Sequence, residues 1–209
     1  MNPQREPIIN APWPAAVVVA AIVGGYVLQT LVPQEPLLTR YGFSPAAFDA
    51  GARETVVTAL FLHGSWAHAL LNGSFALAFA PPVARLFGPR VAGVAAFFLF
   101  YLVCGALGNL GFALVHPGSN AIVVGASGAV AGLMGAASRM MAGRGTLGPI
   151  ISRPAIGMAL AWVAVNMIVA VVGFAPGVGD GPVAWEAHLA GYAAGLLLIR
   201  PAAALFRRP

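Results

Sequence analysis

Residues 91–115 read VAGVAAFFLFYLVCGALGNLGFALV, an uncharged apolar run that is long enough to cross a membrane as a helix. The rest of the chain has the same character: 59% of its 209 residues are hydrophobic, only 8% are charged, and the mean hydropathy is +0.85. Soluble domains carry about 25% charged residues. The composition therefore excludes an ordinary water-soluble domain and predicts an all-α integral membrane protein.

Six apolar runs predict a bundle of six transmembrane helices, at residues 13–32, 64–82, 91–115, 123–142, 154–174 and 185–205. Residues 13–206 would form one domain, with a short N-terminal stretch (1–12) before it and a tail (207–209) after it. The first run is longer than the core of a usual signal peptide, so we expect an uncleaved span. The long loop 33–63 between the first two runs carries charges and is expected to lie in the membrane interface or to dip into the protein.

The charges alternate between the two ends of these runs. Nine arginines fall on one side: Arg5, Arg85, Arg90, Arg139, Arg144, Arg153, Arg200, Arg207 and Arg208. Five of the six acidic residues fall on the other side. The positive-inside rule then predicts that both termini are cytoplasmic. A bacterial inner membrane is expected because no organellar presequence precedes the first run, and the scattered arginines form no nucleic-acid-binding cluster.

Cys104 is the only cysteine, so an intramolecular disulfide and a thiolate metal cluster are both excluded. It lies inside the run 91–115, where a packed thiol is expected.

Three small polar groups interrupt the apolar runs, and such residues are functional candidates because they are costly in hydrocarbon. In the first group, His68 and Asn72 are four residues apart and share one face of a helix. Both side chains can donate hydrogen bonds toward the same point. Hydrogen bonds to neighbouring helices are the alternative explanation of the pair.

The other two groups are Gly125-Ala126-Ser127-Gly128 and Trp185-Glu186-Ala187-His188. Each is followed by glycines at helical spacing, which lets another helix approach closely. If the two glycine faces pack together, Ser127 and His188 meet near the outer ends of their helices, as a nucleophile and its base must. The glycines expected to support this packing are Gly125, Gly128, Gly132, Gly191 and Gly195.

These strings resemble the rhomboid family of intramembrane serine proteases in order, spacing and placement on the second, fourth and sixth runs. The matching strings are TALFLHGSWAH (58–68) with Asn72, VGASG (124–128), and EAHLAG (186–191) with Gly195. The resemblance covers about Phe43 to Leu198. It implies a six-helix rhomboid-like fold and a serine endopeptidase that cleaves transmembrane segments of membrane-protein substrates near the outer face of the bilayer.

The resemblance also implies the roles of the site residues. Ser127 would be the nucleophile and His188 the general base, without a third acid. The oxyanion would be held by the Ser127 backbone N–H and by the side chains of His68 and Asn72. No cofactor or metal is needed, and the oligomeric state and the physiological substrate stay open.

Some positions depart from the common pattern of that family. A Trp-Arg pair usually precedes the threonine that matches Thr58, but here residues 53–57 read RETVV. Ala80 and Ala84 stand where the second span often carries Gly and Glu.

A further departure concerns the general base itself. Ala131 stands where an aromatic residue often stacks on the catalytic histidine. We expect Tyr192 or Trp185 to support His188 instead.

Four other interpretations are weaker. Residues 177–180 (GVGD) match a motif of intramembrane aspartyl proteases, but Asp180 lies in a predicted loop and has no aspartate partner in the membrane. A zinc site from His63, His68 and His188 lacks the usual spacing and a supporting carboxylate; His63 is expected to anchor the preceding loop, and His116 to lie in an outer loop.

A transporter would need membrane acids or interrupted helices. A non-catalytic relative that escorts transmembrane helices is the main alternative, although such relatives typically lack the serine or the histidine.

Overall fold

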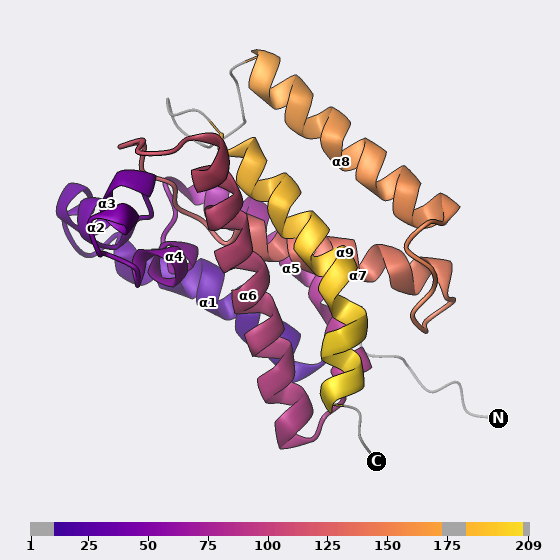
Figure 1. Cartoon of the computed structure of the whole chain (residues 1–209). Helices are drawn as coiled ribbons and strands as arrows, with labels where there is room; N and C mark the ends of the chain where they lie inside the picture. The colour runs from indigo at the N-terminus through magenta and orange to yellow at the C-terminus, as the bar shows by residue number, and fades with distance from the viewer. Residues whose placement is uncertain (1–10, 173–182, 207–209) are drawn as a thin grey trace.

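The computed structural model describes residues 11–172 and 183–206, and the regular elements in these ranges are helices (Figure 1). The longer helices are α1 (Trp13–Gln29), α5 (Trp66–Phe87), α6 (Val91–Val115), α7 (Ser127–Ala142), α8 (Arg153–Val172) and α9 (Trp185–Phe206). Short helices α2 (Gln34–Tyr41), α3 (Pro45–Asp49) and α4 (Thr55–Thr58), with the 3₁₀ turn η1 (Ala59–Phe61), lie between α1 and α5. The all-α prediction is confirmed for the described ranges.

Three of the described helices are long and apolar enough to cross a membrane: α5, α6 and α9 as far as Leu205. Helix α1 and the part of α8 from Arg153 to Ile168 are apolar but shorter. By length and composition these helices belong to an integral membrane protein. The count of six spans stays a prediction.

Helix α7 is the central helix of the structure. It packs against α5, α6, α8 and α9, whereas α8 lies at the edge, away from the short helices α2–α4 (Figure 1). Every residue from Gly128 to Met140 is buried. A helix that is enclosed on all sides can approach its neighbours only if its side chains are small, and α7 is accordingly rich in Gly, Ala and Ser.

The contact between α7 and α9 is made backbone against backbone. A Cβ atom added at Gly191 would collide with the Gly128 carbonyl, and one added at Gly195 would lie 2.6 Å from the Gly132 Cα atom and collide with its carbonyl oxygen. These distances are far below van der Waals contact. The two helices can therefore lie at this separation only with glycine at both positions of α9.

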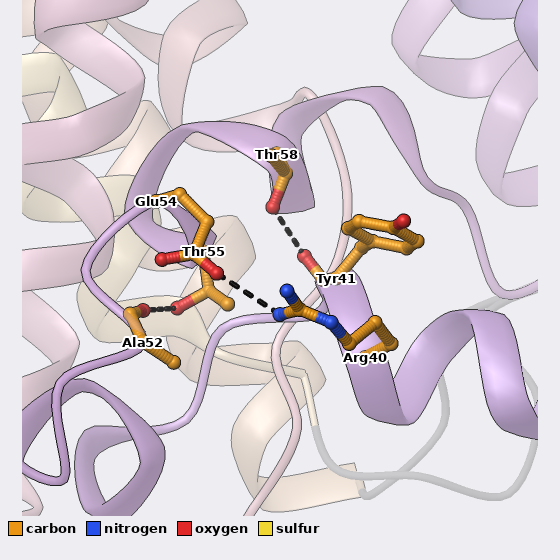
Figure 2. Close-up of polar contacts among 6 residues, drawn as sticks. All are labelled: Arg40, Tyr41, Ala52, Glu54, Thr55 and Thr58. Atoms are coloured by element: carbon orange, nitrogen blue, oxygen red, sulfur yellow. Dashed lines mark hydrogen bonds and ion pairs between the residues drawn. The ribbon is translucent and has the colours of Figure 1, made fainter.

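The segment between α1 and α5 is held together by local polar contacts, which Figure 2 shows. Arg40 Nη1 lies 2.9 Å from Glu54 Oε1, and the Thr58 hydroxyl donates a 2.7 Å hydrogen bond to the Tyr41 carbonyl. The Thr55 hydroxyl donates to the Ala52 carbonyl at 2.6 Å. The first two contacts join the end of α2 to residues 54–58, in the region where the Trp-Arg pair is missing from the sequence.

The ion pair between Arg40 and Glu54 lies at the exposed surface of this segment. The hydrogen bond from Arg40 holds the pKa of Glu54 below its usual value. Because the folded-state pKa is lowered, the stabilisation is present above the unfolded-state pKa and is lost as the pH falls through the folded-state value. Exposed pairs are weak, so this ion pair adds little to the stability of the segment.

The same segment positions the stretch that precedes α7. Phe43 and Val123 exchange two backbone hydrogen bonds, of 3.0 and 2.7 Å, and the Gly125 N–H donates to the Ala59 carbonyl at 3.0 Å. The extended pairing explains why α7 begins at Ser127 and not at residue 123, where the apolar run begins. Loop 33–63 thus fixes the position of the first residue of α7.

Arg139 shows a role that charge counting does not reveal. Its side chain is buried, with 3% of the residue exposed. The guanidinium donates to the Gly148 carbonyl at 3.0 and 2.9 Å and to the Leu196 carbonyl at 3.2 Å. Arg139 therefore ties the end of α7 to the following loop and to α9.

We predict that Gly195→Ala destabilises the protein by about 1–3 kcal/mol, because the new methyl group forces α9 away from α7. Thermal unfolding in detergent, followed by circular dichroism, would show the loss as a lower Tm. Gly157→Ala is the matched control, since a Cβ at this α8 position meets nothing within 4 Å. Equal Tm values for Gly195→Ala and the parent would contradict the close-contact explanation.

Candidate active site

Ser127 and His188 meet at the ends of the two helices that the glycines bring together. Ser127 is the first residue of α7, and His188 lies in the first turn of α9. His188 Nε2 lies 2.8 Å from Ser127 Oγ. This is the distance of a hydrogen bond between a hydroxyl and an imidazole, and it allows a proton to pass from the serine to the histidine.

The other ring nitrogen of His188 contacts α8. His188 Nδ1 lies 2.7 Å from Asn166 Oδ1, and the Asn166 Nδ2 group donates to the Trp162 carbonyl at 2.8 Å. The Trp162 ring lies beside the imidazole, with centroids 5.7 Å apart and planes tilted by 39°. Two residues of α8, one turn apart, therefore contact the histidine ring.

The expectation that Tyr192 or Trp185 supports His188 is wrong. The Tyr192 hydroxyl instead donates to the Ala155 carbonyl at 3.3 Å, because its side chain points to the far end of α8. Asn166 was missed by the sequence reasoning. The available signal was an amide side chain in the otherwise apolar run 154–174, which costs free energy in a membrane unless it is hydrogen-bonded.

His68 and Asn72 lie on α5, near Ser127 and His188. Ser65 caps this helix by accepting a 3.1 Å hydrogen bond from the His68 N–H, and the Asn72 Nδ2 group donates to the His68 carbonyl at 3.0 Å. The His68 ring lies against Gly125, and its Nε2 is 2.8 Å from where a Cβ of that residue would be. The structure thus brings together Ser127, His188, His68 and Asn72.

All four side chains line one cavity of about 250 Å³. Asn166 and Trp162 of α8 also line it, and its remaining walls are mostly apolar residues of α5, α7, α8 and the stretches that precede α7 and α9. The site therefore combines a serine–histidine pair, two further side chains that can donate hydrogen bonds, and a largely apolar space in which electrostatic contacts are strong.

Comparison with known proteins identifies the family of the chain. The family model of the rhomboid domain matches residues 51–204. The chain belongs to the rhomboid family. A curated relative in Bacillus subtilis (strain 168), named "Putative rhomboid protease YdcA", is 36% identical over 80 residues. That match covers 38% of this chain and only 37% of the relative's length.

The structure shows which contacts replace the usual ones at the positions that depart from the common rhomboid pattern. Ala131 belongs to a cluster of apolar side chains that includes Trp162 and Tyr192. Trp162 thus supplies, from α8, an aromatic ring next to His188 where α7 carries only a methyl group. Ala80 and Ala84 are buried in the main hydrophobic core, so apolar packing replaces the Gly and Glu of the common pattern at these positions.

Gly125 has a different role from the one predicted. It precedes α7 and lies outside the contact with α9, so the prediction of helix packing is wrong for this residue. Its φ of +123° is a conformation that L side chains rarely adopt, and a Cβ would lie 2.7 Å from His68 Cε1. Glycine at this position lets the His68 ring approach Ser127.

His63 and His116, the other two histidines, each connect two segments of the chain. The His63 backbone is held by Gln29, whose amide donates to the His63 carbonyl at 2.7 Å and accepts from its N–H at 2.9 Å. His116 ends α6, and its Nε2 lies 2.7 Å from Glu186 Oε1. His63 therefore ties loop 33–63 to α1, and His116 ties α6 to the first turn of α9.

Within residues 11–172 and 183–206, no three His, Cys, Asp or Glu side chains are grouped as metal ligands would be. Residues 177–180, with the chance GVGD match, lie outside the described residues, as do residues 1–10 and 207–209.

We predict that Gly125→Ala slows the reaction of Ser127 with a fluorophosphonate by roughly 10²-fold, because the displaced His68 no longer stabilises charge on the phosphoryl oxygen. Labelling rates of the purified protein measure the effect. Gly118→Ala is the matched control: Gly118 also has a positive φ, of +68°, but a Cβ there meets nothing within 4 Å. Similar losses in both variants would mean that backbone strain, not His68, is responsible.

Proposed function

We propose that this rhomboid is an intramembrane serine endopeptidase with a Ser127–His188 dyad. The observation that carries the proposal is the 2.8 Å contact between His188 Nε2 and Ser127 Oγ, inside a cavity that His68 and Asn72 also line. A serine and a histidine that served only helix packing would not need to face an open cavity together.

The reaction begins when Ser127 Oγ attacks a substrate carbonyl carbon and its proton passes to His188 Nε2. The tetrahedral intermediate collapses, the C–N bond breaks, and the leaving amine takes the proton from Nε2. A water molecule then attacks the acyl-enzyme and gives a proton to His188. When the C–Oγ bond breaks, that proton returns to Ser127, and the substrate leaves as a carboxylic acid.

The negative oxygen of each intermediate needs hydrogen-bond donors. The Ser127 backbone N–H is in the first turn of α7, where amides have no partner within the helix and the helix dipole favours negative charge. His68 and Asn72 line the cavity and can supply two side-chain donors, a ring N–H of His68 and the Asn72 amide N–H that does not bond to the His68 carbonyl. Each such donor contributes about 10²–10³ to the rate in comparable sites.

The substrates of this activity are transmembrane segments of other proteins. The apolar walls of the cavity suit the side chains of such a segment, which lose little free energy on leaving lipid. We infer six spans with both termini in the cytoplasm, because this arrangement places the arginine-rich ends inside. The dyad then opens toward the outer face, in a bacterium the periplasmic face of the inner membrane, and cuts near that end of the substrate.

The alternative is a non-catalytic rhomboid that binds and escorts transmembrane helices. It predicts that substrate binding does not depend on the dyad and that no product forms. The retained contact between Ser127 and His188 favours the protease, since an escort has no use for a proton path between them.

We predict that Ser127→Ala and His188→Ala abolish cleavage of a reporter transmembrane substrate in proteoliposomes, whereas His68→Ala and Asn72→Ala lower kcat by roughly 10²-fold. Product formation followed on gels measures both effects. Ser74→Ala is the control, since this exposed α5 serine bonds only to its own helix at Leu70 in the described contacts. Cleavage by Ser127→Ala at the parental rate would exclude the dyad.

We also predict opposite exposure of two loops. A cysteine at Asn120 should react with a membrane-impermeant maleimide from outside the cell, and one at Thr146 only from the cytoplasmic side, because an odd number of spans separates them. Both positions are exposed, and the native Cys104 is buried, so the parent protein serves as background. Labelling of both from the same side would contradict the six-span topology.

A further inference from the structure

Asn166 contacts the general base of the proposed protease, and its amide orientation is determined by its own hydrogen bonds. Its Nδ2 group lies 2.8 Å from the Trp162 carbonyl, which can only accept. The flipped amide would set two acceptor oxygens against each other. Asn166 must therefore present Oδ1, an acceptor, to His188 Nδ1 at 2.7 Å.

An acceptor at this position decides the protonation pattern of the imidazole. A neutral histidine carries one N–H, on either Nδ1 or Nε2. Because Asn166 Oδ1 accepts from Nδ1, the proton belongs on Nδ1, and Nε2 faces Ser127 with its lone pair. Only this tautomer can take the serine proton.

The surroundings of Asn166 make the contact specific. The residue is 3% exposed, so water competes poorly for either of its amide groups. Its hydrogen bond to Trp162 joins it to the residue whose ring lies beside the face of the same imidazole. Helix α8 thus contacts the imidazole through two residues, one by a hydrogen bond and one by its ring.

We propose that Asn166 is a positioning residue of the active site, which holds His188 in the Nδ1–H tautomer and accepts its hydrogen bond throughout the reaction. This inference rests on the proposed protease activity. When His188 takes the serine proton, the imidazolium still donates Nδ1–H to Asn166 Oδ1, so the charge forms without a change of hydrogen-bond partner. Asn166 itself neither gains nor loses a proton.

The test compares the parent with Asn166→Leu, which keeps the volume of the side chain and removes the acceptor. We expect kcat to fall about 10- to 100-fold, because one buried hydrogen bond to a group that becomes charged contributes about this much to the rate. KM should stay within about twofold. Asn166→Asp restores an acceptor at Nδ1 and should recover part of kcat. Ile168→Ala, at an exposed position of the same helix, is the matched control.

A second measurement does not require activity. The chain has four histidines, so ¹⁵N-histidine NMR in lipid can assign the His188 ring nitrogens by comparison with His188→Ala. In the parent, Nδ1 should carry the proton and Nε2 should not. In Asn166→Leu both tautomers should appear.

The outcomes separate this inference from the proposed function. A fall in kcat at constant KM, together with mixed tautomers in Asn166→Leu, supports the positioning role. An Nε2–H tautomer in the parent, or a parental tautomer and kcat in Asn166→Leu, overturns it. If the parent cleaves no transmembrane substrate, the protease proposal fails, and the tautomer comparison alone still decides whether Asn166 orients His188.

Discussion

The α7–α9 contact, in which Gly191 and Gly195 lie against the backbone of Gly128 and Gly132, sets the distance between Ser127 and His188. Both residues stand in the first turn of their helix, so the distance between the helix axes determines how close the two side chains lie. A methyl group at either α9 glycine would overlap the α7 backbone, so α9 could not keep its present distance from α7. Helix packing in the bilayer relies on van der Waals contact between small residues, and here the same contact also builds the site.

Loop 33–63, α5 and α8 supply the rest of the site around the α7–α9 contact. Loop 33–63 pairs with residues 123 and 125 and so holds the chain in the extended form that places Ser127 at the start of α7. Helix α5 contributes His68 and Asn72 from one face, and α8 contributes Asn166 and Trp162 from another. Because four helices supply the cavity, a small shift of any of them changes the reactive geometry.

His188 has no charged partner among the described contacts; its Nδ1 group faces a neutral amide. A carboxylate at this depth would have to be desolvated, at a cost of several kcal/mol that a single hydrogen bond does not return. An asparagine orients the imidazole without that cost. Its second amide group is satisfied by the Trp162 carbonyl, so no polar atom of the side chain depends on water.

The sequence by itself determined the membrane class, the approximate helix ranges and the four residues that meet in the cavity, because hydropathy and helical spacing are local properties of the chain. It could not determine the partner of His188, since Asn166 lies 22 residues away on another helix and only packing selects it over Tyr192 or Trp185. It likewise gave Gly125 the wrong role. Glycine is required at this position because of its positive φ and because the His68 ring lies close to it. Contacts between distant segments decide these points, and only the tertiary structure contains them.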